Sequence, residues 1–459
     1  MNRDVIIIGL FLLAQPIIGV FFSRRTPIKN EVDFLLGGRN LGIFLTTFTL
    51  FATWFGAETS LGTASNIYQY GLSGGRIDPF GYTISLLLMG FILAKKFREL
   101  NLTTMADLFA LRYGKLTEKI SVFLLVPSTL IWTAAQLKAF GYIMNQVIVL
   151  PMWLHLLIGL VIILTYTLFG GFLGSVWTDL FQAIFLIVGL VFIFVMTMRF
   201  LPQPMVDLQN IAREGISFYR KGETWWENLN GWAVPILGSF TSQEMISRIL
   251  ATKDSKIAVK SLYLASFMYL LVGMIPVILG FLTPSILGHS ILNIVDTDQI
   301  LPQLAGILMP SGFALLFQAA LISAVLSTAD SSILTVSGLF SHNLIPSIFP
   351  VMSEQKKLLC NRIVLLGCGV ITYILAINSD KIIRLLEIAS SFGTSGVLII
   401  TLVALFKPQW CHAKAAQITL VTGISAQLVL EHLLHIPGSY LINIILCFFT
   451  YFLSRFNYQ

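Results

Sequence analysis

The stretch FALLFQAALISAVLSTADSSILTVSGLFSHNL, residues 313–344, is apolar enough to span a bilayer and yet carries a dense row of small hydroxyl side chains. These are Ser323, Ser327, Thr328, Ser331, Ser332, Thr335 and Ser337, with Asp330 among them. Residues three and four positions apart are neighbours on a helix, so Ala324, Ser327, Thr328 and Ser331 share one face. The stretch therefore predicts a transmembrane helix with a polar face.

Two interpretations of this face remain open from its spacing. Small residues let transmembrane helices pack closely, and hydroxyls can return hydrogen bonds to the preceding turn. Alternatively, two hydroxyl oxygens and a freed backbone carbonyl can replace the water shell of Na⁺.

Composition decides the broad class of the protein. Of the 459 residues, 56% are hydrophobic and only 11% are charged, whereas soluble domains carry about 25% charged residues. The mean hydropathy is +0.84. The chain is therefore predicted to be an integral membrane protein with the lipid bilayer as its surroundings.

The net charge of +7 would suggest nucleic acid as a partner of a soluble protein. Here Lys and Arg lie in short loops between apolar runs, which is the pattern that sets membrane topology. We expect no nucleic-acid partner, and no obligatory protein partner is evident. The four cysteines and six histidines show no spacing typical of a metal site or a catalytic triad, so we do not expect an enzyme.

Apolar runs of about 20 residues number roughly thirteen. They lie at 4–22, 41–68, 77–96, 116–147, 151–169, 173–200, 228–248, 257–287, 306–343, 360–378, 383–406, 414–432 and 437–455. Basic loops alternate with acidic or balanced ones, which predicts an outside N-terminus and a cytoplasmic C-terminus. We expect a multi-pass protein of the plasma membrane, or of the inner membrane if the cell is bacterial.

Two of these spans are interrupted. Gly56, Glu58 and Gly62 break the second span in mid-membrane, where an irregular backbone survives only if it lines a site. A second interruption lies at 238–244, five spans later. An odd number of spans per repeat makes the two halves run oppositely through the membrane, as in the inverted repeats of secondary transporters.

Five stretches, in this order, carry a resemblance to a known family. They are GGRNLG (37–42), ATWFGAETSLGTASNIYQYG (52–71), TTMADLFALRYGK (103–115), YTLFGGFLGSVWTDLFQ (166–182) and SAVLSTADSSIL (323–334). Together they make the chain similar to the sodium:solute symporter family. Within it, ATWFG and STADSSIL look most like the high-affinity choline transporter branch.

The resemblance implies an all-α fold with a leucine-transporter-like core of five plus five helices, two of them broken. The core is expected at 41–406, with repeats at about 41–200 and 228–406. One extra helix and a cytoplasmic loop would precede it in 1–40, and two extra helices would follow it in 407–459. Alternating access would be driven by the Na⁺ gradient.

The family's Na⁺ ligands carry over onto matching positions of this chain. They would be the backbone carbonyls of Ala52, Phe55 and Ala324 and the hydroxyls of Ser327 and Thr328. Asp179 resembles a family acid on the inner Na⁺ pathway. The alternative for Asp179 is an interfacial charge near a helix start, which the helix dipole favours.

In the choline branch, aromatic faces hold the ammonium group, because a quaternary cation has no hydrogen-bond donor. The matching positions are Trp54, Tyr82 and Trp132, each of which can equally be a packing aromatic. Ser242 stands where that branch has a Trp, so the aromatic cage is incomplete.

Four further residues near the breaks are candidates for the solute site. Glu58 and Glu244 can hold a substrate amine, a second cation or a proton, since a buried carboxylate is costly unless paired. The alternative for each of them is a salt bridge to a neighbouring Lys or Arg, such as Arg248, one turn from Glu244. Gln136 and Gln243 are pocket candidates, although Gln also joins helices by hydrogen bonds.

The sequence thus predicts a Na⁺-coupled symporter that imports a small organic solute, cationic or zwitterionic. Two alternatives stay open. One is a sensor or regulatory membrane protein that has lost transport, although the sequence shows no output module. The other is a proton-coupled symporter of a carboxylate or neutral solute that uses Glu58 or Asp179.

Overall fold

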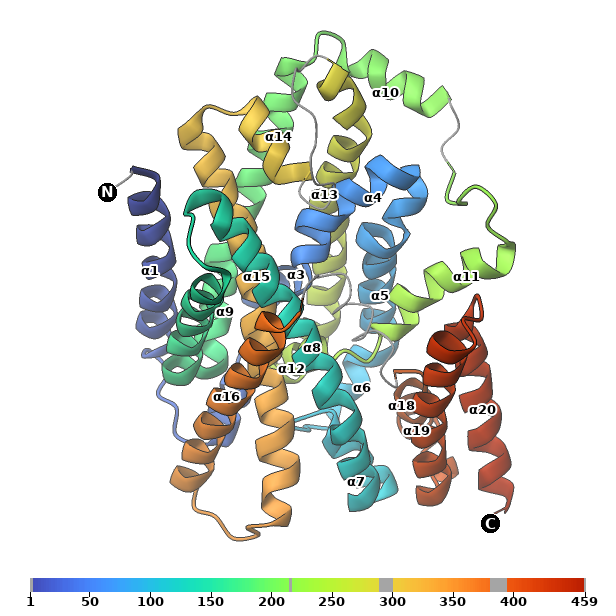
Figure 1. The fold of residues 1–459 in the computed structure, drawn as a ribbon. Coiled ribbons are helices and arrows are strands. Elements are labelled where there is room, and N and C mark those ends of the chain that lie inside the picture. Colours follow the sequence, from blue (N-terminus) through green and yellow to red (C-terminus); the bar gives the residue numbers. More distant parts are fainter. Residues whose placement is uncertain (1–2, 214–216, 289–299, 380–393, 458–459) are drawn as a thin grey trace.

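The computed structural model describes residues 3–213, 217–288, 300–379 and 394–457. Within these ranges the chain is mainly helical, with one isolated bridge between Leu41 and Thr252 and no β-strand. Figure 1 shows a bundle with the N-terminus in its upper half and the C-terminus at its lower end.

The helices of the first half are α1 (Arg3–Ser23), α2 (Glu31–Leu36), η1 (Gly37–Arg39), α3 (Ile43–Trp54), η2 (Glu58–Gly62), α4 (Thr63–Tyr70), η3 (Gly71–Arg76), η4 (Ile77–Gly81), α5 (Tyr82–Leu88), η5 (Met89–Leu93), α6 (Ala94–Glu99), α7 (Ala106–Tyr113), α8 (Lys115–Val147) and α9 (Met152–Phe200). Those of the second half are α10 (Pro204–Arg213), α11 (Trp225–Ala233), η6 (Val234–Gly238), α12 (Gln243–Ala251), α13 (Ser255–Gly288), α14 (Ile300–Leu308), α15 (Ser311–Gly338), η8 (Leu339–Leu344), η9 (Ile345–Ser347), α16 (Glu354–Ile377), α18 (Thr394–Phe406), η10 (Pro408–Trp410), α19 (Ala413–Gln427), η11 (Leu428–Leu433) and α20 (Ser439–Asn457).

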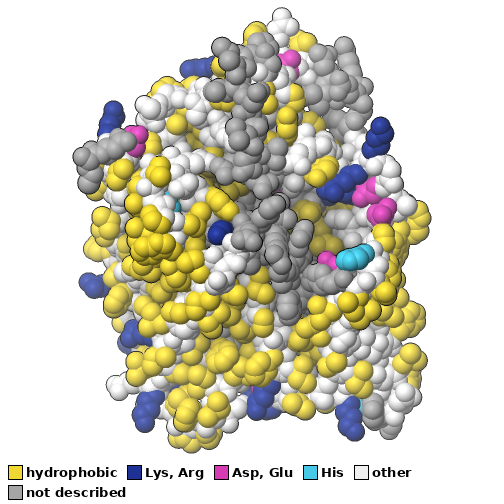
Figure 2. All heavy atoms as spheres, in the orientation of Figure 1, with side chains coloured by type: hydrophobic (Ala, Val, Ile, Leu, Met, Phe, Trp, Pro, Cys, Tyr) yellow, Lys and Arg dark blue, Asp and Glu magenta, His cyan; other side chains and the backbone are white. Residues whose placement is uncertain are grey.

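Apolar side chains cover much of the outside of this bundle. Leu10, Phe91 and Phe123 are among many large hydrophobic residues that are well exposed, and Figure 2 shows a broad apolar band with Lys and Arg toward its edges. In the described ranges, nine helices are long and apolar enough to cross a membrane. The expectation of an all-α membrane protein is confirmed, while the total of thirteen spans stays a prediction because part of 383–406 lies outside the described residues.

Helix α15, which carries the hydroxyl face, lies at the centre of the bundle (Figure 1). It packs against α8, α9, α16 and α3. From Ala319 to Leu334 every residue is buried, so both its apolar and its polar faces meet other helices. Any polar group on α15 therefore has to find its partner inside the protein.

Both predicted interruptions are present. Helix α3 ends at Trp54, Phe55 has the non-helical angles φ −78° and ψ 65°, and the chain resumes as the π-helical turn η2. The second break falls after η6, and α12 begins again at Gln243 with Ser242 as its N-cap. The inverted repeat and the boundaries 1–40, 41–406 and 407–459 stay predictions.

A further break divides α9, whose 49 residues contain the predicted spans 151–169 and 173–200. Gly171 has φ +53° and ψ −145°, a region of backbone space that is almost confined to glycine. A Cβ atom there would lie 2.8 Å from the carbonyl oxygen of Phe34. The turn between the two halves of α9 thus requires glycine for both its conformation and its close approach to α2.

We predict that Gly171→Ala destabilises the protein by about 1–3 kcal/mol, the range typical of a strained backbone position. Thermal unfolding of the purified protein in detergent measures this change. Gly367→Ala is the matched control, because an added Cβ at Gly367 in α16 meets nothing within 4 Å. Equal melting temperatures for the two variants would contradict the argument.

Candidate functional site

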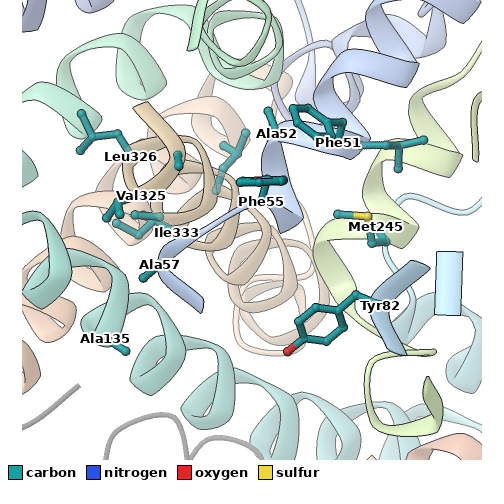
Figure 3. Packing of buried hydrophobic residues seen from close by; sticks show 14 of the residues in the cluster. Phe51, Ala52, Phe55, Ala57, Tyr82, Ala135, Met245, Val325, Leu326 and Ile333 are labelled. Atoms are coloured by element: carbon teal, nitrogen blue, oxygen red, sulfur yellow. The ribbon is translucent and has the colours of Figure 1, made fainter. Parts of the chain in front are cut away.

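The first break in the chain lies directly against the hydroxyl face of α15. The Ser327 hydroxyl donates a hydrogen bond of 2.8 Å to the carbonyl oxygen of Ala52 and one of 2.9 Å to that of Ala324. The Thr328 hydroxyl also donates to the carbonyl of Ala324, at 3.2 Å. Figure 3 shows Ala52, Phe55 and Ala57 following one another through the break beside α15.

Gly56, in the first break, packs closely against Thr328 and Gln136. A Cβ atom on Gly56 would lie 2.7 Å from the Thr328 hydroxyl oxygen and 2.9 Å from Oε1 of Gln136. The Gln136 oxygen accepts a hydrogen bond of 2.9 Å from the backbone N–H of Ala57. Since Phe55 directly precedes Gly56, the structure gathers the five predicted Na⁺ ligands and Gln136 around one break.

This arrangement is chemically suited to a hard cation. It offers carbonyl and hydroxyl oxygens without a sulfur or imidazole ligand, which is the donor set that Na⁺ and similar cations use. The two hydroxyls now donate to carbonyls, but a hydroxyl can rotate and present a lone pair instead. The site can therefore exchange its internal hydrogen bonds for an ion.

Asp179 lies in α9 and is completely buried within the protein. Its Oδ2 atom is 3.1 Å from Nη2 of Arg248, which is 1% exposed, and it also accepts a short hydrogen bond from Thr49. Arg248 further donates to Ser331 of α15. Glu244 contacts the Arg248 guanidinium through its backbone carbonyl, which accepts a hydrogen bond of 3.1 Å, and not through its carboxylate. The alternative of a Glu244–Arg248 ion pair is therefore wrong for this structure.

Asp330 adds a second acid to this buried network. Its Oδ1 atom accepts hydrogen bonds from Ser175 at 3.0 Å and from Ser331 at 2.8 Å. Sequence reasoning noted Asp330 but gave it no role, and it treated Arg248 only as a neighbour of Glu244. Their separation along the chain hides the connection, because Arg248 and Ser331 are 83 positions apart.

Two aromatic candidates and one acidic candidate for the solute site contact one another next to the break. The rings of Trp54 and Tyr82 lie 5.3 Å apart between centroids at an angle of 43°. The Tyr82 hydroxyl donates a hydrogen bond of 2.7 Å to the carboxylate of Glu58. These three residues form a group with an aromatic wall and a buried carboxyl group.

Four other candidates have no hydrogen bond or ring contact with that group among the described residues. They are Trp132, Ser242, Gln243 and Glu244. The Gln243 amide donates to the sulfur of Met105 at 2.9 Å and to the carbonyl of Thr241 at 3.0 Å. The buried Ser242 hydroxyl has no partner. A role for these residues in solute binding stays a prediction.

The C-terminal end of the α15 segment is held by a cluster that sequence reasoning missed. In η8, Nδ1 of His342 is 3.0 Å from a carboxylate oxygen of Glu31, and Nε2 is 3.3 Å from one of Asp107. Burial works to raise the pKa of Asp107, but hydrogen bonds from His342 and from the backbone N–H groups of Thr104 and Thr103 outweigh it and hold this pKa at about 2. The cluster ties α15 to α2 and α7.

Comparison with known proteins agrees with this geometry. Residues 34–423 match the model of the sodium:solute symporter family. The chain belongs to the sodium:solute symporter family. The resemblance found in the five sequence stretches is thereby confirmed, as is the expectation of a transporter and not an enzyme.

The chain is also similar to individual members of this family. It is 27% identical over 412 residues to high-affinity choline transporter 1 of Caenorhabditis elegans, covering 82% of this chain and 69% of that protein. Identity to the human high affinity choline transporter 1 is 28% over 381 residues, covering 78% and 64%. The chain thus spans about two thirds of the length of these relatives.

A solved structure is similar over nearly the whole fold. A substrate-bound, outward-open Na⁺-coupled sialic acid symporter superimposes with a TM-score of 0.85 at 17% identity, covering 99% of this chain and 97% of that one. At this identity the similarity supports the fold alone. It agrees with the family's helical architecture and leaves the solute open.

We predict that Arg248→Met destabilises the protein by about 3–5 kcal/mol, because removing one member of a buried ion pair leaves an uncompensated charge. Adding Asp179→Asn to that variant should recover part of the loss, and thermal unfolding in detergent compares the single and double variants. If the two substitutions were additive, Asp179 and Arg248 would not form an energetically coupled pair.

We also predict a pH-dependent contribution from Asp107. Its pKa falls from 3.8 to about 2 on folding, so its charge stabilises the fold above pH 3.8 and this contribution disappears as the pH falls toward 2. Asp107→Asn should cost on the order of 2 kcal/mol at neutral pH. The difference in melting temperature between wild type and variant should narrow below pH 4, and a pH-independent difference would contradict this account.

Proposed function

We propose that the protein is a Na⁺-coupled symporter that imports a small organic solute with a cationic or zwitterionic headgroup. The family supplies the class of activity. The observation that carries the proposal is the hydrogen bond from Ser327 in α15 to the carbonyl of Ala52 at the break. It joins the broken helix to the facing helix through the very oxygens that would bind the ion.

The Na⁺ ion would bind between α3 and α15, where it replaces these internal hydrogen bonds with ion contacts. Because the ligands come from both helices, bound Na⁺ favours the conformation in which the two helices hold this spacing. The solute would bind beside Trp54, the last residue of α3, so both ligands act on the same break. Coupling between two such sites is typically about 1–3 kcal/mol.

Release would occur toward the cytoplasm, where Na⁺ is scarce. Asp179 and Arg248 lie next to α15 at Ser331, one helical turn beyond Ser327. We infer that this buried network lines the inner route of the ion. In this orientation the N-terminus is outside and the C-terminus is cytoplasmic, as the basic loops predict.

The solute side of the proposal rests on Trp54, Tyr82 and Glu58. A carboxylate beside an aromatic wall favours a positively charged headgroup. The choline transporters among the relatives agree with a cationic solute. Ser242, which replaces the expected Trp, argues for a headgroup that differs from choline.

We predict that the double variant Ser327→Ala, Thr328→Val loses Na⁺-dependent uptake, because both hydroxyl ligands are removed while the helix is kept. The measurement is uptake of a labelled solute panel into proteoliposomes, with an inward Na⁺ gradient and with K⁺ in its place. A loss of at least about 100-fold in Na⁺ affinity is expected from two lost oxygen ligands of roughly 1.5 kcal/mol each.

Ser337→Ala is the matched control for this experiment. Ser337 is equally buried on α15, but its hydroxyl donates only to Leu334 in its own helix, at 2.7 Å. Its uptake should stay Na⁺-dependent. Wild-type Na⁺ dependence in the double variant would contradict the site, and wild-type uptake that follows a proton gradient and ignores Na⁺ would favour the proton-coupled alternative.

A further inference from the structure

A second buried carboxylate lies next to the solute group, and sequence reasoning did not include it. Asp78 in η4 is only 4% exposed. Its Oδ2 atom accepts a hydrogen bond of 3.0 Å from the Tyr269 hydroxyl and a short one from the Thr59 hydroxyl. Its Oδ1 atom is buried and has no hydrogen-bond partner among the residues that the structure describes. One of the two oxygens of this carboxylate is thus available to a ligand.

Glu58 is linked to Asp78 by its neighbour in the sequence. It directly precedes Thr59 in the π-helical turn η2, and the Thr59 hydroxyl donates a hydrogen bond to Asp78. Turns of this kind occur often at functional sites. The rings of Trp54 and Tyr82 stand beside Glu58, so the two acids and the aromatic wall belong to one site.

Several acids of the described residues have a basic partner, whereas Glu58 and Asp78, like Glu244 and Asp330, have none. Asp179 is paired with Arg248, Glu118 with Lys115, and Glu31 and Asp107 with His342. In the part of the chain that the structure describes, no Lys, Arg or His forms an ion pair with Glu58 or Asp78. Two buried carboxyl groups without a basic partner each hold a proton or bind a cation, so a positively charged ligand can take the place of a proton at this site.

We propose that Glu58 and Asp78 together bind a primary or secondary ammonium group of the transported solute. This inference rests on the proposed function and narrows its substrate class. An ammonium with two or more N–H groups can donate to Glu58 and to the unpaired Oδ1 of Asp78 at the same time, in charge-assisted hydrogen bonds. A quaternary ammonium has no such donor and would leave Oδ1 unsatisfied.

Tyr269 connects this site to the Na⁺ site. Its hydroxyl donates to Asp78 and lies 3.2 Å from the carbonyl oxygen of Trp54, the last residue before the break. Its hydroxyl is also 2.7 Å from that of Thr59. An ammonium group bound to Asp78 would therefore be linked through Tyr269 to Trp54 before the break and to Thr59 after it.

The experiment compares matched amines with their fully methylated analogues as ligands of the purified full-length chain. The pairs are ethanolamine and choline, glycine and betaine, and 1,4-diaminobutane and its hexamethyl analogue. Each is titrated in Na⁺ buffer while thermal unfolding is followed, because a ligand that binds the folded state raises the melting temperature. We expect at least one primary amine to stabilise the protein, with an apparent affinity about tenfold or more above that of its quaternary partner.

Variants identify the residues responsible. Asp78→Asn and Glu58→Gln should each weaken binding of the preferred amine by about tenfold or more and should reduce its advantage over the quaternary analogue. Glu227→Gln is the control, since Glu227 lies in the first turn of α11, where its carboxylate accepts hydrogen bonds from Thr224, and this variant should bind as wild type does. The wild-type ligand ranking tests the inference even if a variant fails to fold.

Several results would overturn the inference. These are equal or tighter binding of the quaternary analogues, binding of none of the amines, and unchanged amine affinity in both acid variants. If any of these results is obtained and the protein still takes up another solute in a Na⁺-dependent manner, the ammonium site is wrong but the proposed Na⁺ symport is retained. Amine binding by a protein whose uptake ignores Na⁺ would instead overturn the coupling and keep the ammonium site.

Discussion

A helix that breaks inside a bilayer must have its freed backbone groups satisfied by other parts of the protein, because lipid offers no hydrogen bonds. In this chain the carbonyl of Ala52 is satisfied by Ser327, and the N–H of Ala57 by Gln136. Helices α15 and α8 are therefore held against the break by the same groups that repair it. The central position of α15 follows from this requirement.

The hydrogen bond from Ser327 to the Ala52 carbonyl also bears on the proposed Na⁺ site. A carbonyl within an intact helix already accepts a hydrogen bond from an N–H group of the next turn, so only its second lone pair is available to a ligand. At the break, the Ala52 carbonyl is occupied by a hydroxyl that can rotate. In the proposed function Na⁺ would replace that hydroxyl contact, and ion binding would then depend on the spacing of the two helices.

Buried charge is handled in two different ways around this centre. On the α9 side, Asp179 is balanced permanently by Arg248. On the opposite side of the break, Glu58 and Asp78 accept hydrogen bonds from tyrosine and threonine hydroxyls but have no partner of opposite charge among the described residues. In the proposed ammonium site, the solute would supply the positive charge that Glu58 and Asp78 lack, whereas Asp179 has its basic partner within the protein.

The sequence by itself determined the membrane class, the all-helical fold, both helix breaks and the hydroxyl face of α15, because hydropathy, glycines and helical spacing are local properties. It also indicated the family, whose matching positions meet at one break. Only the tertiary structure decided that Arg248 pairs with Asp179 and not with Glu244, and that Asp78 joins Glu58. These choices depend on packing between helices that are distant in the chain, and no local pattern encodes which buried charges come into contact.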